Sequence, residues 1–386
     1  MLAGFAVAGV SPLALVAVSL ATATGLRLAF LVPATAAGLA LFVAPLAVWS
    51  GFSRSIASEG GLYAFVERAA GSRLAKVQGW IWIVSYLLYL PYTVTYIVYY
   101  LLPYVLPLRG PWPQVLEVAL PVVLSLAVLT AERAALVALA VLAAAEMVGA
   151  VALAAFVLLR PAPGRAVALA LPAPHVLPAF IGGAAQVSLL LVCLSLVVFL
   201  GGEAQGGGAA IRRALAVGFA AVCVVTLAGA VALAAGGTAS VIASWLPGVA
   251  LLRRADATGL ATGVGVVALV GIAGVIVAEF VALVRLGGTM LGLDRRTGAA
   301  LVAAFFVFAD VASLANPQRF YTVAIAPSVV ALYLSQLVVF LAFPVLAVRE
   351  GRGRSPGPWL VAAVAVVWSL VGLYGAVTGA VSAGVL

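Results

Sequence analysis

Residues 53–103, SRSIASEGGLYAFVERAAGSRLAKVQGWIWIVSYLLYLPYTVTYIVYYLLP, decide the fold of this chain. The part up to Lys76 is polar, glycine-containing and mostly basic, whereas the part after Lys76 is apolar and rich in Trp and Tyr. A helix needs about 20 mainly apolar residues to cross a bilayer. The stretch therefore predicts a basic loop followed by a long membrane-spanning helix near residues 74–106.

The aromatic residues of this helix share one face. At about 100° per residue they fall within an arc of roughly 140°: Trp82, Tyr86, Tyr89, Tyr92, Tyr96, Tyr99 and Tyr100. The opposite face carries Val84, Leu87, Pro91, Val94 and Val98. We expect the aromatic face to offer hydroxyl groups to a polar interior and the other face to meet lipid. Tyr86 and Tyr89, near mid-helix, are candidate substrate-binding residues.

Composition sets the class of protein. The 386 residues are 66% hydrophobic and 8% charged, with a mean hydropathy of +1.28, which is typical of a polytopic membrane protein. The formal charge of +9 is scattered between apolar runs, so we expect a lipid bilayer and not nucleic acid as the partner. One histidine and two cysteines without ligand spacing predict no metal site, no cofactor and no enzyme.

Hydropathy predicts an all-α protein with eleven spanning segments. We expect the apolar amino terminus to be the first of them and not a cleaved signal. The predicted segments are 5–24, 28–50, 74–106, 114–130, 134–160, 178–201, 211–236, 262–288, 298–315, 321–348 and 358–384.

Arginine and lysine predict the orientation. With the amino terminus in the cytoplasm, thirteen of the twenty basic residues lie on the inner side and seven on the outer side. Cytoplasmic loops carry the excess of such residues. We therefore expect a multi-pass protein of the cell membrane with a cytoplasmic amino terminus.

The loop sequence SEGGLYAFVERAAG at 58–71, followed by Gln78-Gly79-Trp80 and the aromatic helix, resembles the junction of the second and third helices in amino acid–polyamine–organocation permeases. Alternatively, the glycines only allow turns in a short loop. The resemblance implies two inverted repeats of five helices, here about 5–160 and 178–348. Such permeases usually have a further helix pair, whereas only 358–384 remains here, so the oligomeric state is not predicted.

In such a fold, the first helix of each repeat is interrupted near the midplane, where free backbone groups meet the substrate. In the first segment the candidates are Ala8, Gly9, Val10 and Ser11, followed by Pro12. Glycine allows unusual dihedral angles, and proline removes an N–H donor. The alternative is a kinked but continuous membrane helix.

The sixth segment contains no central glycine or proline. Permeases of this family commonly have a glycine about ten residues before an acidic residue at the inner end. Here Glu203 is that acidic residue, and Cys193, Leu194 and Ser195 take the place of the break. An unbroken helix whose small residues pack against neighbours is an equally good interpretation.

Three carboxyl groups lie inside apolar segments: those of Glu146, Glu279 and Asp310. An ionised carboxylate at the bilayer centre costs about 2.5–3.5 kcal/mol on insertion scales, so each should face protein or water, or hold a proton. Each is a candidate for proton coupling or for contact with a substrate amine. The alternative role is hydrogen-bonded packing.

The resemblance implies a secondary active transporter of amino acids or related small organic amines that works by alternating access, with proton coupling. Sodium coupling is not expected, because Val270 to Gly274 in the eighth segment contains no hydroxyl residue. The alternative function is a non-transporting membrane sensor or accessory subunit with the permease fold. The sequence does not identify the solute.

Overall fold

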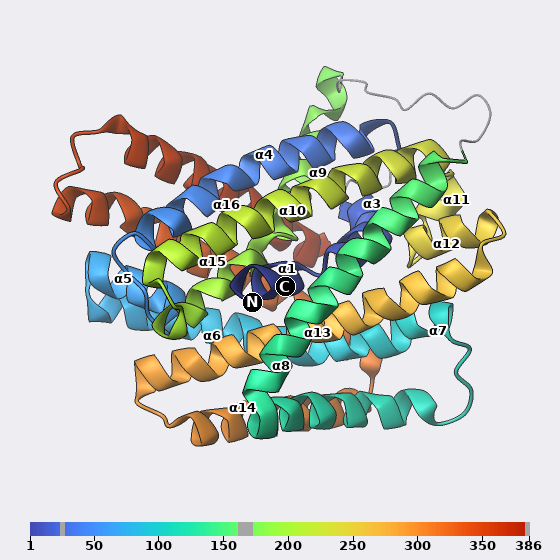
Figure 1. The fold of residues 1–386 in the computed structure, drawn as a ribbon, viewed down its shortest axis with the longest axis horizontal. Coiled ribbons are helices and arrows are strands. Elements are labelled where there is room, and N and C mark those ends of the chain that lie inside the picture. Colours follow the sequence, from blue (N-terminus) through green and yellow to red (C-terminus); the bar gives the residue numbers. More distant parts are fainter. Residues whose placement is uncertain (24–27, 161–172, 383–386) are drawn as a thin grey trace.

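A computed structural model describes residues 1–23, 28–160 and 173–382 of the chain as a bundle of long helices. Figure 1 shows most of these helices running side by side along the longest axis. The described residues contain no strand. The prediction of an all-α protein is confirmed.

The first half of the chain begins with a helix broken into short pieces. The elements are α1 (Leu2–Val10), α2 (Pro12–Ala14), the π-helix η1 (Leu15–Ser19), α3 (Leu20–Ala23), α4 (Leu28–Phe52), α5 (Gly61–Ala70), α6 (Ser72–Thr95), the π-helix η2 (Tyr96–Leu101), α7 (Leu102–Val105) and α8 (Trp112–Leu158).

The second half begins with another divided helix. The elements are the 3₁₀-helix η3 (Pro174–Val176), α9 (Leu177–Leu189), the 3₁₀-helix η4 (Val192–Glu203), α10 (Gly207–Gly236), α11 (Ala239–Ile242), α12 (Pro247–Arg254), α13 (Thr258–Leu291), α14 (Arg295–Ser313), α15 (Pro317–Arg349) and α16 (Pro356–Ser382).

Ten helices among the described residues are long and apolar enough to cross a membrane. One of them, α8, has 47 residues, about twice the length that a bilayer requires. Its backbone leaves the helical region at Ala131 (φ −146°, ψ 41°), and Figure 1 shows a sharp bend between its two arms. The arms are the predicted segments 114–130 and 134–160, so the expected eleven passages are present. Residues 24, 383 and 384 of the predicted segments lie outside the described part.

Helices α6 and α15 are joined by buried polar contacts. Ser85 Oγ donates to the backbone oxygen of Ser328, and Ser328 Oγ donates to the backbone oxygen of Ser85, both at 2.8 Å. Nearby, Gln78 Nε2 donates to Ser335 Oγ at 2.9 Å. Such hydrogen bonds between small polar residues stabilise helix association in a membrane, because the hydrophobic effect does not drive helices together in lipid.

The expectation that one face of the aromatic helix meets lipid is only partly correct. Val84 is 48% exposed, but Val94 and Val98 are fully buried. The reason is that α6 packs against α13, α14 and α8 as well as α15. A helix with neighbours around most of its circumference buries apolar residues on more than one face.

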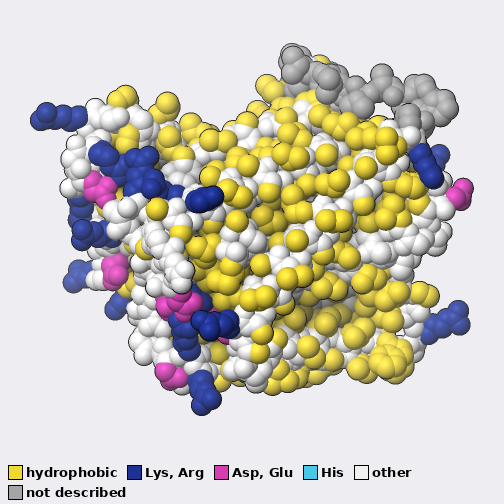
Figure 2. Space-filling view, viewed as in Figure 1, with side chains coloured by type: hydrophobic (Ala, Val, Ile, Leu, Met, Phe, Trp, Pro, Cys, Tyr) yellow, Lys and Arg dark blue, Asp and Glu magenta, His cyan; other side chains and the backbone are white. Residues whose placement is uncertain are grey.

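Charged residues gather at the ends of the bundle. Figure 2 shows a broad hydrophobic band with charged side chains at either side of it, and most of the Lys and Arg lie at the end where Figure 1 places α5. We call this end, with the loops 53–60 and 292–294, the basic end. The band and the hydrophobic spans are those of a multi-pass membrane protein.

An ion-pair cluster closes the bundle at the basic end. Arg285 is 2% exposed, and its Nη2 lies 2.7 Å from Glu132 Oε1 and 3.0 Å from Glu203 Oε2. Its Nη1 donates to the backbone oxygen of Phe199 at 3.3 Å. Arg295 contacts Glu203, and its Nη2 lies 2.8 Å from Glu59 Oε1. The cluster thus ties η4, α8 and α13 to the loop before α5.

Arg285→Met should destabilise the protein far more than Arg295→Met. The buried Arg285 makes three contacts, and a hydrogen bond to a charged group contributes about 1.5–3 kcal/mol, whereas an exposed ion pair contributes about 0–1 kcal/mol. The Arg295 side chain is 50% exposed. Thermal unfolding of both variants in the same detergent measures the difference, and equal losses would contradict a buried role for Arg285.

Candidate functional site

The first candidate residues form a real break in the chain. Helix α1 ends at Val10, and Ser11 has left-handed dihedral angles (φ 49°, ψ 71°) before Pro12 begins α2. Positive φ is uncommon for a residue other than glycine, and it marks either strain or a functional constraint. A π-helix, η1, follows directly. The prediction of an interruption here, and not of a continuous kinked helix, is confirmed.

The sixth segment is also broken, which its sequence did not decide. Helix α9 ends at Leu189, a turn follows at Leu190 and Leu191, and the chain continues as the 3₁₀-helix η4 to Glu203. Runs of 3₁₀-helix longer than three or four residues are uncommon and often mark a hinge. The interpretation as one unbroken helix is therefore wrong.

The two breaks touch each other. A Cβ atom placed on Gly9 would lie 2.8 Å from the backbone oxygen of Cys193 and 3.4 Å from Leu196 Cδ1. Because this first obstacle is backbone, it cannot move aside as a flexible side chain can. Gly9 thus allows α1 and η4 to approach at backbone distance.

A cavity of about 320 Å³ lies beside the two breaks. This is within the usual range for small-molecule sites. Its polar and aromatic lining includes Ser11, Ser19, Ser85, Tyr86, Tyr89, Tyr92, Thr93, Tyr96, Gln186, Cys193, Glu279, Tyr321 and Ser328. The structure thus brings four predicted site residues of the breaks, Gly9, Val10, Ser11 and Cys193, together with Tyr86 and Tyr89.

Glu279 supplies the one carboxyl group among the described residues that line the cavity. Its Oε1 accepts a hydrogen bond from Cys193 Sγ at 3.4 Å, and Cys193 Sγ lies 3.8 Å from the Tyr86 hydroxyl. Its Oε2 is buried and has no hydrogen-bond partner among the described residues. Among the described residues, no Lys or Arg lines the cavity. The cavity therefore offers an uncompensated acid to a solute.

Glu146 lies behind the first break. The Ser11 hydroxyl donates to Glu146 Oε1, and the carboxyl group is fully buried. Gly271 of α13 makes room for this pair, because a Cβ atom there would collide with both Glu146 Oε1 and Ser11 Oγ. Since Ser11 lines the cavity while Glu146 does not, Ser11 connects the carboxyl group to the site.

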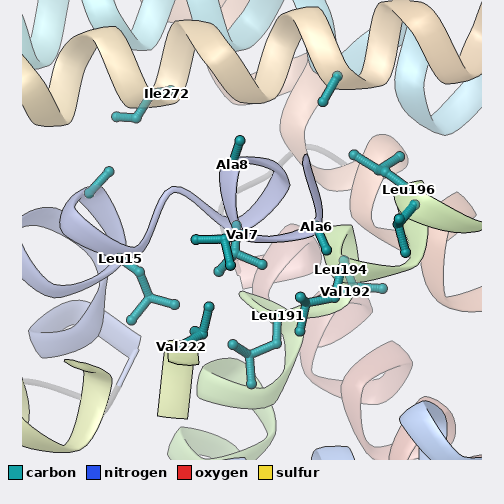
Figure 3. Packing of buried hydrophobic residues seen from close by; sticks show 14 of the residues in the cluster. Ala6, Val7, Ala8, Leu15, Leu191, Val192, Leu194, Leu196, Val222 and Ile272 are labelled. Atoms are coloured by element: carbon teal, nitrogen blue, oxygen red, sulfur yellow. The ribbon is translucent and has the colours of Figure 1, made fainter. Parts of the chain in front are cut away.

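Some predicted residues lie elsewhere. Ala8, Leu194 and Ser195 are buried in the packing around the breaks and do not line the cavity. In Figure 3, Ala8 points from α1 toward α13, while Leu194 lies among the apolar residues on the other side of α1. Asp310 is fully buried in α14, also away from the cavity.

Sequence reasoning missed Glu117, a fourth buried carboxyl group, at the start of α8. Its position near the end of a predicted segment gave no sign that it would be buried. It also missed Gln186, Tyr321 and Ser328 of the cavity. No group of three or more His, Cys, Asp or Glu residues that could hold a metal occurs in the described part of the chain.

The cavity opens toward the end opposite the basic end. A second cavity of about 470 Å³ shares Ser19, Tyr96, Gln186, Leu190 and Tyr321 with the first, and reaches Trp245. Tyr96 and Tyr321 stack between the two, with ring centroids 5.5 Å apart. On the other side, Trp82 packs against Phe199 with centroids 4.7 Å apart, next to the Arg285 cluster. Access is therefore closed at the basic end.

Comparison with solved structures identifies the fold. The manganese transporter of Eremococcus coleocola superposes with a TM-score of 0.63 at 12% identity, over 98% of this chain and 87% of that one. A Na⁺-coupled sialic acid symporter gives 0.55 at 13% identity, over 97% and 89%. MHP1, a nucleobase-cation-symport-1 family transporter, gives 0.52 at 12% identity, over 98% and 93%. No protein-family model and no curated protein matches the sequence.

The chain has the fold of these proteins, the five-plus-five inverted-repeat transporter fold. At such low identity the likeness concerns the fold alone. It agrees with the two breaks, which lie in the first and sixth segments as that fold requires.

Gly9→Leu should abolish ligand binding while the protein remains folded in detergent, because the side chain must displace the Cys193 backbone from the break. Gly263→Leu is the matched control: it lies in the apolar helix α13 with nothing within 4 Å of its Cβ position. The affinity for a ligand identified by a thermal-shift screen of amino acids and amines is measured on both variants after size-exclusion chromatography. Unchanged affinity in Gly9→Leu would remove the break from the site.

Proposed function

We propose that this protein is a secondary active transporter of amino acids or related small organic amines, of the amino acid–polyamine–organocation type. The observation that carries the proposal is the uncompensated Glu279 in a cavity between two interrupted helices. A protonated amine would supply the missing charge, since charge-assisted hydrogen bonds are the strong ones. The tyrosines of α6 would pack against the apolar part of the solute.

The conformation supports alternating access. With the basic end in the cytoplasm, the cavity adjoins an outward-facing second cavity and is shut inward by Trp82, Phe199 and the Arg285 cluster. The amino terminus is then cytoplasmic. For the solute to leave inward, these contacts must separate while the stacked Tyr96 and Tyr321 close the other side. The repeats about 5–160 and 178–348 would supply the two moving halves, with α16 outside them.

Glu146 is the proposed proton carrier. It contacts the broken backbone at Ser11 and has a second buried oxygen, Oε2, without a partner among the described residues. Movement at the break would change its access to water and so let it load and release a proton. Asp310 lies away from this path.

Glu279→Gln should weaken binding of an amine solute about 10- to 100-fold, because a hydrogen bond to a charged group contributes about 1.5–3 kcal/mol. A thermal-shift screen of amino acids and amines first identifies a ligand, and titration calorimetry then measures its affinity. Glu67→Gln is the matched control, because Glu67 is an exposed residue of α5 that does not line the cavity, and it should keep near wild-type affinity. Equal affinity in wild type and Glu279→Gln would remove the amine contact.

Glu146→Gln should retain solute exchange between loaded proteoliposomes but lose accumulation driven by a pH gradient, because glutamine cannot carry a proton. Wild-type vesicles treated with a protonophore provide the reference for accumulation without a gradient. Accumulation at the wild-type level in Glu146→Gln would exclude it as the carrier. Binding without any flux in the wild-type protein would instead indicate a sensor or accessory subunit.

A further inference from the structure

A second polar cluster lies outside the cavity, where α6, α8 and α14 pack together. It consists of the side chains of Thr95, Glu117, Asp310 and Ser313, each of which is at most 1% exposed. None of the four lines the substrate cavity. Two acidic groups are therefore buried at a place that the proposed transport site does not use.

Glu117 is held in one orientation. Its Oε1 accepts hydrogen bonds from Thr95 Oγ1 at 2.5 Å and from Ser313 Oγ at 2.7 Å. These two hydroxyl donors fix the position of Oε1. The other oxygen, Oε2, is buried and accepts no hydrogen bond from the described residues. It is left for another ligand.

Asp310 has no hydrogen-bond partner for either carboxyl oxygen among the described residues. It lies one turn before Ser313, so the two side chains share a face of α14. Helix α14 ends at Ser313. The last carbonyl groups of a helix carry partial negative charge, which disfavours a carboxylate and favours a cation.

Within the described ranges, no Lys or Arg forms an ion pair with these two acids. The ion pairs of the described residues include neither Glu117 nor Asp310. Burying an unpaired carboxylate is costly, and buried charges are normally paired or coordinate a metal ion. The three unmatched carboxyl oxygens can therefore be neutralised either by protons or by a positively charged ligand.

We propose that Glu117, Asp310, Thr95 and Ser313 form a binding site for a hard cation. The donors are all oxygen atoms, which is the ligand type that Ca²⁺, Mg²⁺ and Na⁺ prefer. Two carboxylates favour a divalent ion, because it neutralises both charges.

The position of the site gives the ion a structural effect on transport. Thr95 is the last residue of α6, and Tyr96, which lines both cavities, begins η2 directly after it. An ion that joins α6 to the start of α8 and the end of α14 fixes the backbone at Thr95, directly before Tyr96. The cation therefore stabilises the scaffold around the mouth of the cavity without contacting the solute.

The test is ion-dependent stability of the full chain in detergent. After treatment with a chelator, thermal unfolding is measured against increasing CaCl₂, MgCl₂ and NaCl, with choline chloride at matched ionic strength. We expect a saturable rise in unfolding temperature, largest with a divalent ion, and heat on titration with the same salt. Glu117→Gln and Asp310→Asn should lose both signals.

Two further variants protect the interpretation. If the Glu117 and Asp310 variants do not fold, Ser313→Ala provides a milder change. It should weaken ion affinity about 10-fold. Glu146→Gln should keep the full ion effect, which separates this site from the proposed proton carrier. The proposal fails if stabilisation equals that of choline chloride, or if only acidification stabilises the protein, since the acids would then simply hold protons.

Discussion

The backbone of a membrane-spanning helix must satisfy its own hydrogen bonds, and the whole architecture of this protein depends on the two places where it does not. Irregular backbone at membrane depth is tolerated only when protein or a cavity surrounds it. Here the break at Ser11 lies in the first segment and the turn at Leu190 in the sixth, and the two segments pack against each other. Gly9 allows α1 to approach the Cys193 carbonyl group. Each break thus shields the other, and the cavity forms beside them.

Buried acids are distributed according to what compensates them. Glu279 faces the cavity with one oxygen unmatched, and Glu146 accepts a hydrogen bond from Ser11. Glu117 accepts two hydroxyl donors, whereas Asp310 accepts none. An acid whose oxygen atoms all have partners gains little from a further ligand. Binding of a solute, proton or cation is therefore most favourable at the acids that lack partners.

The sequence predicted those features that local chemistry determines. Gly9, Ser11 and Pro12 marked the first segment as a candidate break, because glycine and proline weaken a helix locally. The resemblance to permeases was needed to favour a break over a kink, since prolines also lie inside the continuous helices α4, α6 and α15. The second break has no such residue, and it follows from packing of η4 against α1 and α10. Burial of Val94, Val98 and Glu117 likewise depends on how many helices pack around the segment. The hydrophobic periodicity of a single segment does not reveal that number.

Ser11 links the geometry of the break to the charge of the proposed carrier. Its backbone adopts the left-handed conformation that ends α1, and its hydroxyl donates to Glu146 in the space that Gly271 leaves. An ionised carboxylate accepts this hydrogen bond more strongly than a neutral acid does. Protonation therefore weakens the contact that holds the strained residue, and a change of backbone at Ser11 weakens the hold on the charge. Under the proposed function, a proton at Glu146 and a solute beside Ser11 would therefore act on the same hydrogen bond between these two residues.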